Sequence, residues 1–381
     1  MNEAHAGLYL HIPFCKQACT YCDFHFSTSL QNKAQLVDAM CREIEMRREF
    51  LTAASCLRTL YFGGGTPSLL SAGELDRLLS TVARHFSIDA DAEITLETNP
   101  DDLSPEKLNQ LVAVSINRLS IGVQSFLEAD LQAMNRSHNA AQARACIEGA
   151  RAAGIDNFSV DLIFGLPDQG RAGWGANLDR VLALHVPHLS CYALTLENKT
   201  ALAHQVRSGK VRLQEDETYE KQFLLAHERL EAAGYAHYEL SNYCLPGYAS
   251  RHNTAYWDQI PYLGIGPSAH SFDGTRRAWN VANNARYVQA LEAGKPALAE
   301  EESLTPRDRF NEYLMTGLRR KSGIDAAHIR REWHIDFAAD HAQALTQLIK
   351  EGLLTRLGDR YQLTPRGWLV SDRIIRDFFR L

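Results

Sequence analysis

Apolar runs of strand length alternate with segments of helical period through the first half of the chain. The predicted strands are Leu8–Ile12, Thr59–Phe62, Ile94–Thr98, Arg118–Gly122, Asn157–Ile163 and Leu189–Leu194. The predicted helices are Lys33–Phe50, Ser71–His85, Ser104–Val114, Glu128–Met134 with Ala140–Ala153, and Trp174–His185. Strands that alternate with helices pair in parallel through right-handed crossovers, so the pattern predicts an α/β fold. Chemistry in such folds belongs at the C-terminal ends of the strands.

The pattern changes after Leu194. A helix at Glu215–Ala233 and a strand at Tyr235–Tyr243 are predicted, followed by an aromatic-rich stretch and a charged linker at Gly294–Pro306. The last part combines helices at Asp308–Arg320, Ala326–Trp333 and Phe337–Glu351, a hairpin-like run at Leu353–Leu363, and a final helix after Thr364. We therefore predict a barrel over residues 1–245, an extension over residues 246–304, and a smaller C-terminal α+β domain over residues 305–381.

The order of elements in the C-terminal part resembles a winged-helix module, which raises DNA binding as an alternative function. Residues 305–381 contain 14 Lys+Arg and 10 Asp+Glu, a net charge of +4. This charge is too small and too dispersed for a phosphate-binding face. We expect no nucleic-acid partner and favour a docking module or a lid over the barrel mouth.

The composition is that of an ordinary globular protein, with 45% hydrophobic and 23% charged residues and a net charge of −6. No apolar run approaches the length of a membrane span, and the N-terminus lacks a signal-peptide pattern. We expect a cytoplasmic protein with reduced thiols. A peripheral position at a membrane and a homodimer stay open.

Three cysteines lie close together: Cys15, Cys19 and Cys22, spaced C-x3-C-x2-C. Three thiolates can hold three irons of a [4Fe–4S] cluster and leave the fourth iron open for a small chelator. The alternatives are a zinc site completed by His11 or His25, a disulfide, or a chance grouping. The other cysteines are scattered, and we assign them no role: Cys41, Cys56, Cys146, Cys191 and Cys244.

The wider motif around these cysteines is Y-x-H-I-P-F-C from Tyr9, followed by C-x-Y-C-D-F. It resembles the radical S-adenosylmethionine (radical SAM) superfamily. Within it, the resemblance narrows to the branch of oxygen-independent coproporphyrinogen III dehydrogenases and HemW-type haem chaperones. Matching motifs run from Tyr9 to about Trp279. The resemblance implies an open, partial (β/α)6 radical SAM barrel in which SAM chelates the open iron through its amino and carboxylate groups.

A glycine-rich segment, Gly63–Pro67, follows the second predicted strand. Glycines let the backbone approach a ligand closely, although from the residues alone a tight turn is equally acceptable. The resemblance implies that Gly64, Gly65 and Thr66 meet the amino group of SAM.

Polar residues mark the ends of later strands. Glu97 could bind ribose hydroxyls or lie on a solvated rim, and Asp161 stands in an apolar run where an unpaired charge is costly. Arg136 suits a carboxylate because guanidinium forms a bidentate fork. The resemblance implies that Glu97 and Asp161 contact the ribose and adenosine side of SAM, with Gln124 nearby. The predicted SAM set is completed by Tyr9, Tyr21 and His270, the last assigned to the SAM or substrate cavity.

His252 begins the sequence H-N-x-x-Y-W with Asn253, Tyr256 and Trp257. Imidazole can ligate haem iron and aromatic faces can stack on a porphyrin, but a histidine among aromatics is more often a structural hydrogen-bonding group. The match to the HemW-type motif implies that these four residues bind haem.

Two functions compete within this branch, and three features separate them. The dehydrogenases carry a fourth cysteine two residues after the third, where this chain has Phe24. They also carry a longer N-terminal extension, whereas only eight residues precede Tyr9 here. The H-N-x-x-Y-W motif belongs to the carriers. We therefore expect a chaperone that passes haem to apo-proteins, respiratory ones among them, and keep coproporphyrinogen oxidation as the alternative.

Overall fold

The structure is a computed structural model that describes residues 5–51, 54 and 56–380. Its centre is a run of strands that pair in parallel in chain order, as predicted. They are β1 (His5–Ile12), β2 (Cys56–Gly64), β3 (Ile88–Thr98), β4 (Arg118–Gln124), β5 (Phe158–Phe164) and β6 (His188–Ala193). Their apolar side chains form the main hydrophobic core together with the helices between them.

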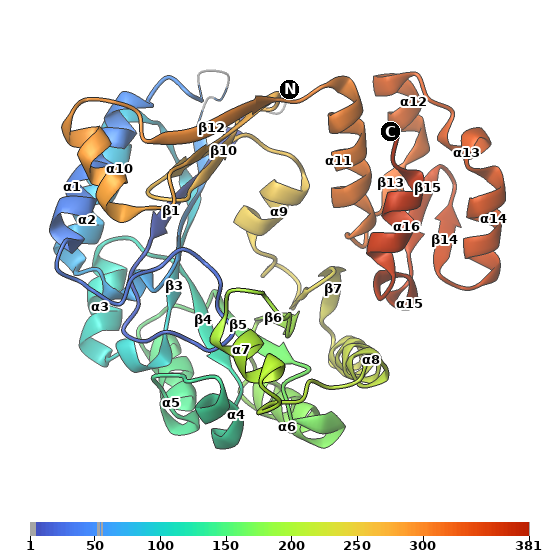
Figure 1. Ribbon diagram of the computed structural model, residues 1–381, viewed down its shortest axis with the longest axis horizontal. Helices are drawn as coiled ribbons and strands as arrows, with labels where there is room; N and C mark the ends of the chain where they lie inside the picture. The colour runs from blue at the N-terminus through green and yellow to red at the C-terminus, as the bar shows by residue number, and fades with distance from the viewer. Residues whose placement is uncertain (1–4, 52–53, 55, 381) are drawn as a thin grey trace.

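The helices between these strands lie on the outer side of the curved sheet (Figure 1). They are α1 (Lys33–Met46), α2 (Ala72–His85), α3 (Pro105–Ala113), α4 (Glu128–Ala133), α5 (Ala140–Ala152) and α6 (Gly170–Ala183), followed by α7 (Ala201–Arg207) and α8 (Asp216–Ala232). Ser71 and Glu74 form the capping box of α2, and Ser104 caps α3 ahead of Pro105. These caps explain why both helices begin where the sequence predicts.

Further strands extend the sheet at both edges, in the order β12-β11-β10-β9-β1-β2-β3-β4-β5-β6-β8-β7. At one edge β9 (Tyr262–Ile265) runs parallel to β1, and β10 (His270–Phe272) and β11 (Arg276–Asn280) continue the sheet in antiparallel pairing. At the other edge are β7 (Ala236–Glu239) and β8 (Asn242–Cys244). The single strand predicted at Tyr235–Tyr243 is therefore wrong: a tight turn splits it into a hairpin, with the Glu239 carboxylate accepting from the Ser241 amide.

The linker predicted at Gly294–Pro306 is also wrong, because Leu298–Ser303 forms strand β12. This strand pairs antiparallel with β11 and is tied to it by an Arg276–Glu301 ion pair of 3.2 Å. Every residue of β12 is exposed. An edge strand with both faces in solvent needs no apolar alternation, so its acidic sequence carries no strand signal.

The C-terminal part has the predicted winged-helix-like order. Its elements are α11 (Pro306–Leu318), β13 (Ile324–Asp325), α12 (Ala326–Trp333), α13 (Phe337–Asp340), α14 (Ala342–Lys350), β14 (Leu354–Leu357), β15 (Arg360–Leu363), α15 (Pro365–Trp368) and α16 (Ser371–Phe378). The strands form a small sheet in the order β13-β15-β14. Figure 1 shows this part beside β7 and α8, and α15 contacts α8.

Two more helices complete the described chain. Helix α10 (Asn284–Glu292) packs against α1, and α9 (Arg251–Trp257) contacts β2. Among the described residues, no helix is long and apolar enough to cross a bilayer.

Candidate functional site

The C-terminal ends of the parallel strands and the cysteine loop enclose a cavity of about 720 Å³. We call it the first cavity. It brings together most of the residues predicted for the cluster and for SAM. Those on its wall are Cys15, Cys19, Tyr21, Cys22, Gly64, Gly65, Thr66, Glu97, Gln124, Arg136 and Asp161. Segments separated by more than a hundred residues therefore meet in one site, as the strand-end rule predicts.

The three cysteines of the loop after β1 face this cavity with their thiols partly buried. The Thr66 hydroxyl lies 3.5 Å from Cys15 Sγ, and Arg136 Nη1 lies 3.2 Å from Cys19 Sγ. Burial raises the pKa of Cys15, and it raises the pKa of Cys22 to about 11. Soft, partly buried sulfur donors fit an iron–sulfur cluster, whose binding releases their protons.

The zinc alternative with His11 as the fourth ligand would break existing hydrogen bonds. Across the part of the chain that the structure describes, no three His, Cys, Asp or Glu side chains are grouped to hold one metal ion. His11 is hydrogen-bonded at both ring nitrogens, to the Tyr9 hydroxyl at 3.1 Å and to the His25 carbonyl at 3.0 Å. A cluster places each thiolate on a different iron, so it does not require the three sulfurs to surround one point.

Arg136 offers the first cavity a buried cation with donor capacity to spare. Its Nη2 donates to the Asn99 side chain at 2.8 Å and to the Gly122 carbonyl at 2.6 Å. Its Nε is buried and has no hydrogen-bond partner within the described residues. An unpaired guanidinium N–H beside the cysteine loop fits a carboxylate ligand, as predicted for SAM.

The glycine loop is held tightly against its neighbours. Gly64 has φ +108°, and a Cβ there would lie 2.5 Å from His11 Cε1; a Cβ at Gly65 would lie 2.7 Å from the Phe14 carbonyl oxygen. The N–H of Gly64 donates to Glu97, that of Gly65 to Ile12, and that of Thr66 to Phe14. These N–H groups already have partners inside the protein, so they are not free to bind a ligand.

Glu97 accepts two hydrogen bonds, from the Gly64 amide at 3.0 Å and from the Tyr61 hydroxyl at 2.8 Å. Burial raises its pKa to about 7, and nearby Asp161 adds to the rise. Tyr61 also lines the first cavity but was not among the predicted residues. Its position two residues after the inward-facing Thr59 is the signal that could have identified it.

Asp161 and Gln124 occupy neighbouring strand ends. The Asp161 carboxylate accepts from the hydroxyls of Ser120 at 3.1 Å and Ser159 at 3.3 Å, and burial raises its pKa. Gln124 has φ +67°, and the pairing of β4 with β5 shifts register just before it. Ser120 and Ser159 were not predicted, because a serine within an apolar strand carries no distinct signal.

Two predicted SAM residues, Tyr9 and His270, lie outside the first cavity. They line a second cavity of about 500 Å³, together with Tyr256 and Tyr262. The two cavities adjoin, because they share wall residues: Asp23, Phe24, Gly64 and Glu97. Tyr9 and His270 therefore lie beside the first cavity rather than on its wall, and the assignment of Tyr9 to SAM and of His270 to the SAM or substrate cavity stays a prediction.

Comparisons with known proteins agree with this arrangement. The Radical SAM superfamily matches residues 9–179, and the HemN C-terminal domain matches residues 304–370. Proteins named "Heme chaperone HemW" are similar over nearly their full length. The relative from Lactococcus lactis is 34% identical, over 97% of this chain and 96% of the relative. The relative from Mycobacterium tuberculosis is 36% identical, over 97% of this chain and 94% of the relative, and the one from Escherichia coli is 32% identical, over 98% of this chain and 97% of the relative. The chain belongs to the HemW heme chaperone family.

The solved structure of coproporphyrinogen III oxidase (HemN) from Escherichia coli, a radical SAM enzyme, superposes with a TM-score of 0.85 at 27% identity. The match covers 99% of this chain and 90% of that one. It confirms the predicted fold class, a radical SAM α/β barrel with a smaller C-terminal domain.

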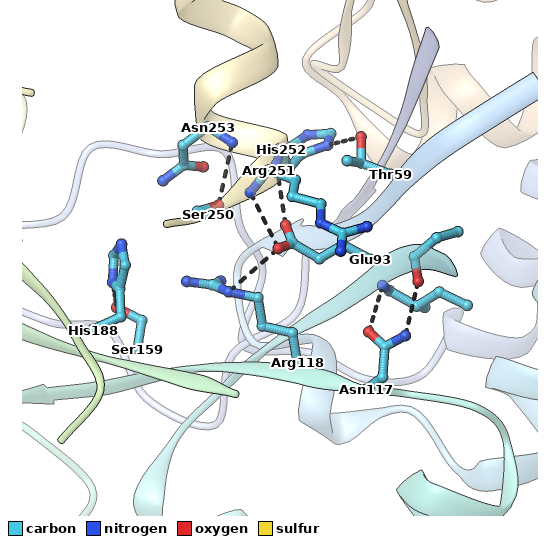
Figure 2. Close-up of polar contacts among 12 residues, drawn as sticks. Thr59, Glu93, Asn117, Arg118, Ser159, His188, Ser250, Arg251, His252 and Asn253 are labelled. Atoms are coloured by element: carbon cyan, nitrogen blue, oxygen red, sulfur yellow. Dashed lines mark hydrogen bonds and ion pairs between the residues drawn. The ribbon is translucent and has the colours of Figure 1, made fainter. Parts of the chain in front are cut away.

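The H-N-x-x-Y-W segment that motivates the HemW resemblance lies on α9. Figure 2 shows Glu93 between the first turn of this helix and Arg118. The Glu93 carboxylate accepts from the backbone amides of Arg251 and His252, both at 3.1 Å, and lies 3.7 Å from Arg118 Nε. Both charged side chains are buried, so α9 is anchored inside the barrel.

His252 itself is 2% exposed. Its Nδ1 is hydrogen-bonded with the Thr59 hydroxyl at 2.8 Å, and its Nε2 with the Tyr256 hydroxyl at 2.9 Å. Its ring also stacks on Tyr61, with centroids 4.8 Å apart, and burial lowers its pKa to about 3. With both ring nitrogens hydrogen-bonded, His252 would have to release one of these contacts to bind iron, and its role as a haem ligand stays a prediction.

The other residues of the HemW-type motif separate in space. Asn253 lies on the wall of the first cavity, and Tyr256 on the wall of the second. Trp257 is half-buried, and its carbonyl lies 3.4 Å from Arg320 Nη1 of the C-terminal part. Asn253 and Tyr256 thus lie on the walls of two adjoining cavities, and the haem-binding role of the motif stays a prediction.

Proposed function

We propose that this protein is a haem chaperone that holds a [4Fe–4S] cluster and SAM in the first cavity and transfers haem to apo-proteins. The observation that carries the proposal is the near full-length similarity to proteins named "Heme chaperone HemW". The chemistry of the first cavity supports it. Soft thiols, a guanidinium with a free N–H and buried carboxylates are what a cluster and SAM require.

In this proposal Cys15, Cys19 and Cys22 hold the cluster. Arg136 receives the SAM carboxylate through its unpaired Nε, and Gly64, Gly65 and Thr66 on the same cavity wall meet the SAM amino group. Glu97 and Asp161 contact the ribose and adenosine side. When bound, the cluster can supply one electron to SAM.

The similarity to the HemN structure keeps coproporphyrinogen oxidation as a second candidate. One assay separates the two. The reconstituted protein is incubated without oxygen with coproporphyrinogen III, SAM and a reductant. The porphyrinogens are then oxidised to porphyrins, which are identified by their fluorescence. In parallel, haem-loaded protein is mixed with apomyoglobin. We expect no protoporphyrinogen and formation of holomyoglobin; a clear yield of protoporphyrinogen would replace the chaperone proposal with the oxidase.

Respiratory acceptors, a homodimer and a peripheral position at the membrane remain predictions. Mass measurement by light scattering tests the dimer, and sedimentation with vesicles of phosphatidylglycerol and phosphatidylethanolamine tests the membrane contact.

A further inference from the structure

A series of hydrogen bonds, which we call the polar relay, runs from the wall of the first cavity to the start of α9. It begins at the Asp161 carboxylate, which accepts from the Ser159 hydroxyl at 3.3 Å. The Ser159 oxygen lies 2.8 Å from His188 Nδ1, and His188 Nε2 lies 2.8 Å from the Tyr238 hydroxyl. The Tyr238 oxygen accepts from the amide of Ser250, the N-cap of α9, at 3.4 Å. The relay therefore joins β5, β6 and β7 to α9.

The middle of the polar relay is shielded from water. Ser159 is 1% exposed and His188 is completely buried, as is Ser250 at the far end. Figure 2 shows the Ser159–His188 pair beside Arg118. Hydrogen bonds in such surroundings are strong, and a group that loses its partner there is costly. Neither His188 nor Tyr238 lines the first cavity, so any influence of these two residues on a ligand must pass through the relay.

The Ser250 amide fixes the direction in which the relay donates. An amide N–H can only donate, so the Tyr238 oxygen accepts from it. Among the described residues, the acceptor for the proton of the Tyr238 hydroxyl is His188 Nε2. Burial and the charge of Arg118 lower the pKa of His188 well below its usual value, so the ring is neutral. With Nε2 accepting, the single N–H of the imidazole lies at Nδ1.

This N–H at Nδ1 of His188 donates to the Ser159 oxygen, which leaves the Ser159 proton for Asp161. In the opposite direction Ser159 would donate to Nδ1, and the Tyr238 hydroxyl would lose its acceptor. Ser190 offers Ser159 another partner, since the two side-chain oxygens lie 3.1 Å apart. The polar relay thus decides whether the Ser159 proton points at Asp161.

We propose that His188 and Tyr238 are positioning residues for the first cavity, and that SAM bound at Asp161 tightens the first turn of α9 through them. The inference rests on the proposed function, in which Asp161 contacts the ribose side of SAM. Ribose hydroxyls that donate to Asp161 stabilise its charged form, which is the stronger acceptor for Ser159. Hydrogen bonds in series polarise one another, so this change strengthens the bonds as far as Ser250. The SAM site is thereby coupled to the helix that carries the H-N-x-x-Y-W motif.

The test is hydrogen exchange of the reconstituted full-length protein with and without SAM, followed by mass spectrometry of peptides from α9. No reductant is added, so SAM is not consumed. In the wild type, SAM should slow the exchange of the α9 amides. Tyr238→Phe removes one hydroxyl and should abolish this slowing, and it should raise the Kd for SAM about 5-fold. Coupling between two sites is reciprocal, so both effects are expected together.

The matched control is Tyr313→Phe, because the Tyr313 hydroxyl also accepts from a backbone amide, that of Asp325 at 3.0 Å, but lies in the C-terminal part. It should behave like the wild type in both measurements. Iron content, and exchange without SAM, should be the same in both variants and in the wild type, which separates a broken relay from misfolding.

A double variant distinguishes the relay from general destabilisation. His188→Phe removes both ring nitrogens, and His188→Phe with Tyr238→Phe should bind SAM no more weakly than His188→Phe alone, because both changes break the same series of bonds. Additive losses, or slowing at α9 in Tyr238→Phe equal to that in the wild type, would overturn the proposal. SAM binding to the wild type without slower exchange at α9 would overturn this inference alone. A wild type that binds no SAM would overturn the proposed function and the inference with it.

Discussion

Glu97 lies on the wall that the two cavities share, and its two oxygens accept hydrogen bonds from the Gly64 amide and the Tyr61 hydroxyl.

The motifs of the sequence predict that Glu97, Arg136 and the cysteines belong to one site, because strand ends converge at one edge of a parallel sheet. They do not predict the hydrogen bonds that orient these groups. The Tyr61–Glu97 contact joins two strands, and His252 reaches Thr59 across nearly two hundred residues, so neither has a local signature.

Glu97 gives the apoprotein a pH-dependent stability. Its folded pKa is raised from 4.5 to about 7, so the native state favours the neutral carboxyl. The stability from this group is present below pH 4.5 and is lost as the pH rises through about 7, on the order of 3 kcal/mol. In Glu97→Gln that loss disappears. We expect the difference in Tm between pH 5 and pH 8 to be smaller in the variant, measured by calorimetry.

The control for this measurement is Glu106→Gln, at an exposed position on α3. It should follow the wild-type profile at every pH. Identical pH profiles for Glu97→Gln and the wild type would contradict the raised pKa of Glu97.

Removing one cluster ligand should prevent cluster assembly. Cys19→Ala leaves two thiols in the loop, and after anaerobic reconstitution we expect loss of the iron–sulfur absorption and of the reduced-state EPR signal. Cys41→Ser, on α1 outside the first cavity, should bind iron like the wild type. Retention of the full iron content by Cys19→Ala would remove the cysteine loop as the cluster site.

At the level of elements, α9 combines a local cap, in which the Asn253 amide donates to the Ser250 hydroxyl, with a buried ion pair. The Glu93 carboxylate bonds the first amides of this seven-residue helix and faces Arg118. Isolated helices of this length are unstable in water, so the Glu93 contacts are expected to add to the stability of α9. Two predictions from the sequence were wrong because contacts within the sheet, not a hydrophobic period, determine these strands. Strand β12 forms by pairing with β11. The β7–β8 hairpin forms because a turn reverses the chain between two short strands.

Glu93→Gln should weaken this anchor and leave the Arg118 charge buried without compensation. We expect a loss of about 3 kcal/mol in the free energy of unfolding, measured with urea. Glu148→Gln is the matched control, because Glu148 pairs with Arg144 on the exposed face of α5. Its cost should stay within about 0.5 kcal/mol. Equal stability of both variants would show that Glu93 does not hold α9.

At the scale of the whole molecule, the C-terminal part is attached to the barrel by polar and aromatic contacts. Arg320 pairs with Asp258 at 2.5 Å, and Arg277 with Glu312 at 2.7 Å. Trp368 meets His237 of β7 edge-on at 4.4 Å and donates its indole N–H to the Leu318 carbonyl at 3.1 Å. The sequence predicted the winged-helix-like order but not this attachment, since interface residues follow the same apolar pattern as core residues.

Trp368→Ala should loosen the C-terminal part from the barrel. Removal of a buried indole is expected to cost about 3–5 kcal/mol, and the C-terminal part should become the first to be cleaved in limited proteolysis. Leu357→Ala, at an exposed position on β14, should leave both measurements unchanged. A proteolysis pattern of Trp368→Ala that matches the wild type would show that other contacts suffice for docking.

Strand β1 carries the cysteine loop and lies between β2 and β9. Its second neighbour, Tyr262–Ile265, is encoded some 240 residues after the last cysteine of the loop. During synthesis β1 therefore remains an edge strand, with one row of backbone groups unpaired, until about two-thirds of the chain has been made. Such late, non-local pairing slows folding. The strand that carries the cysteine loop therefore gains both of its neighbours only after Tyr262–Ile265 has been made.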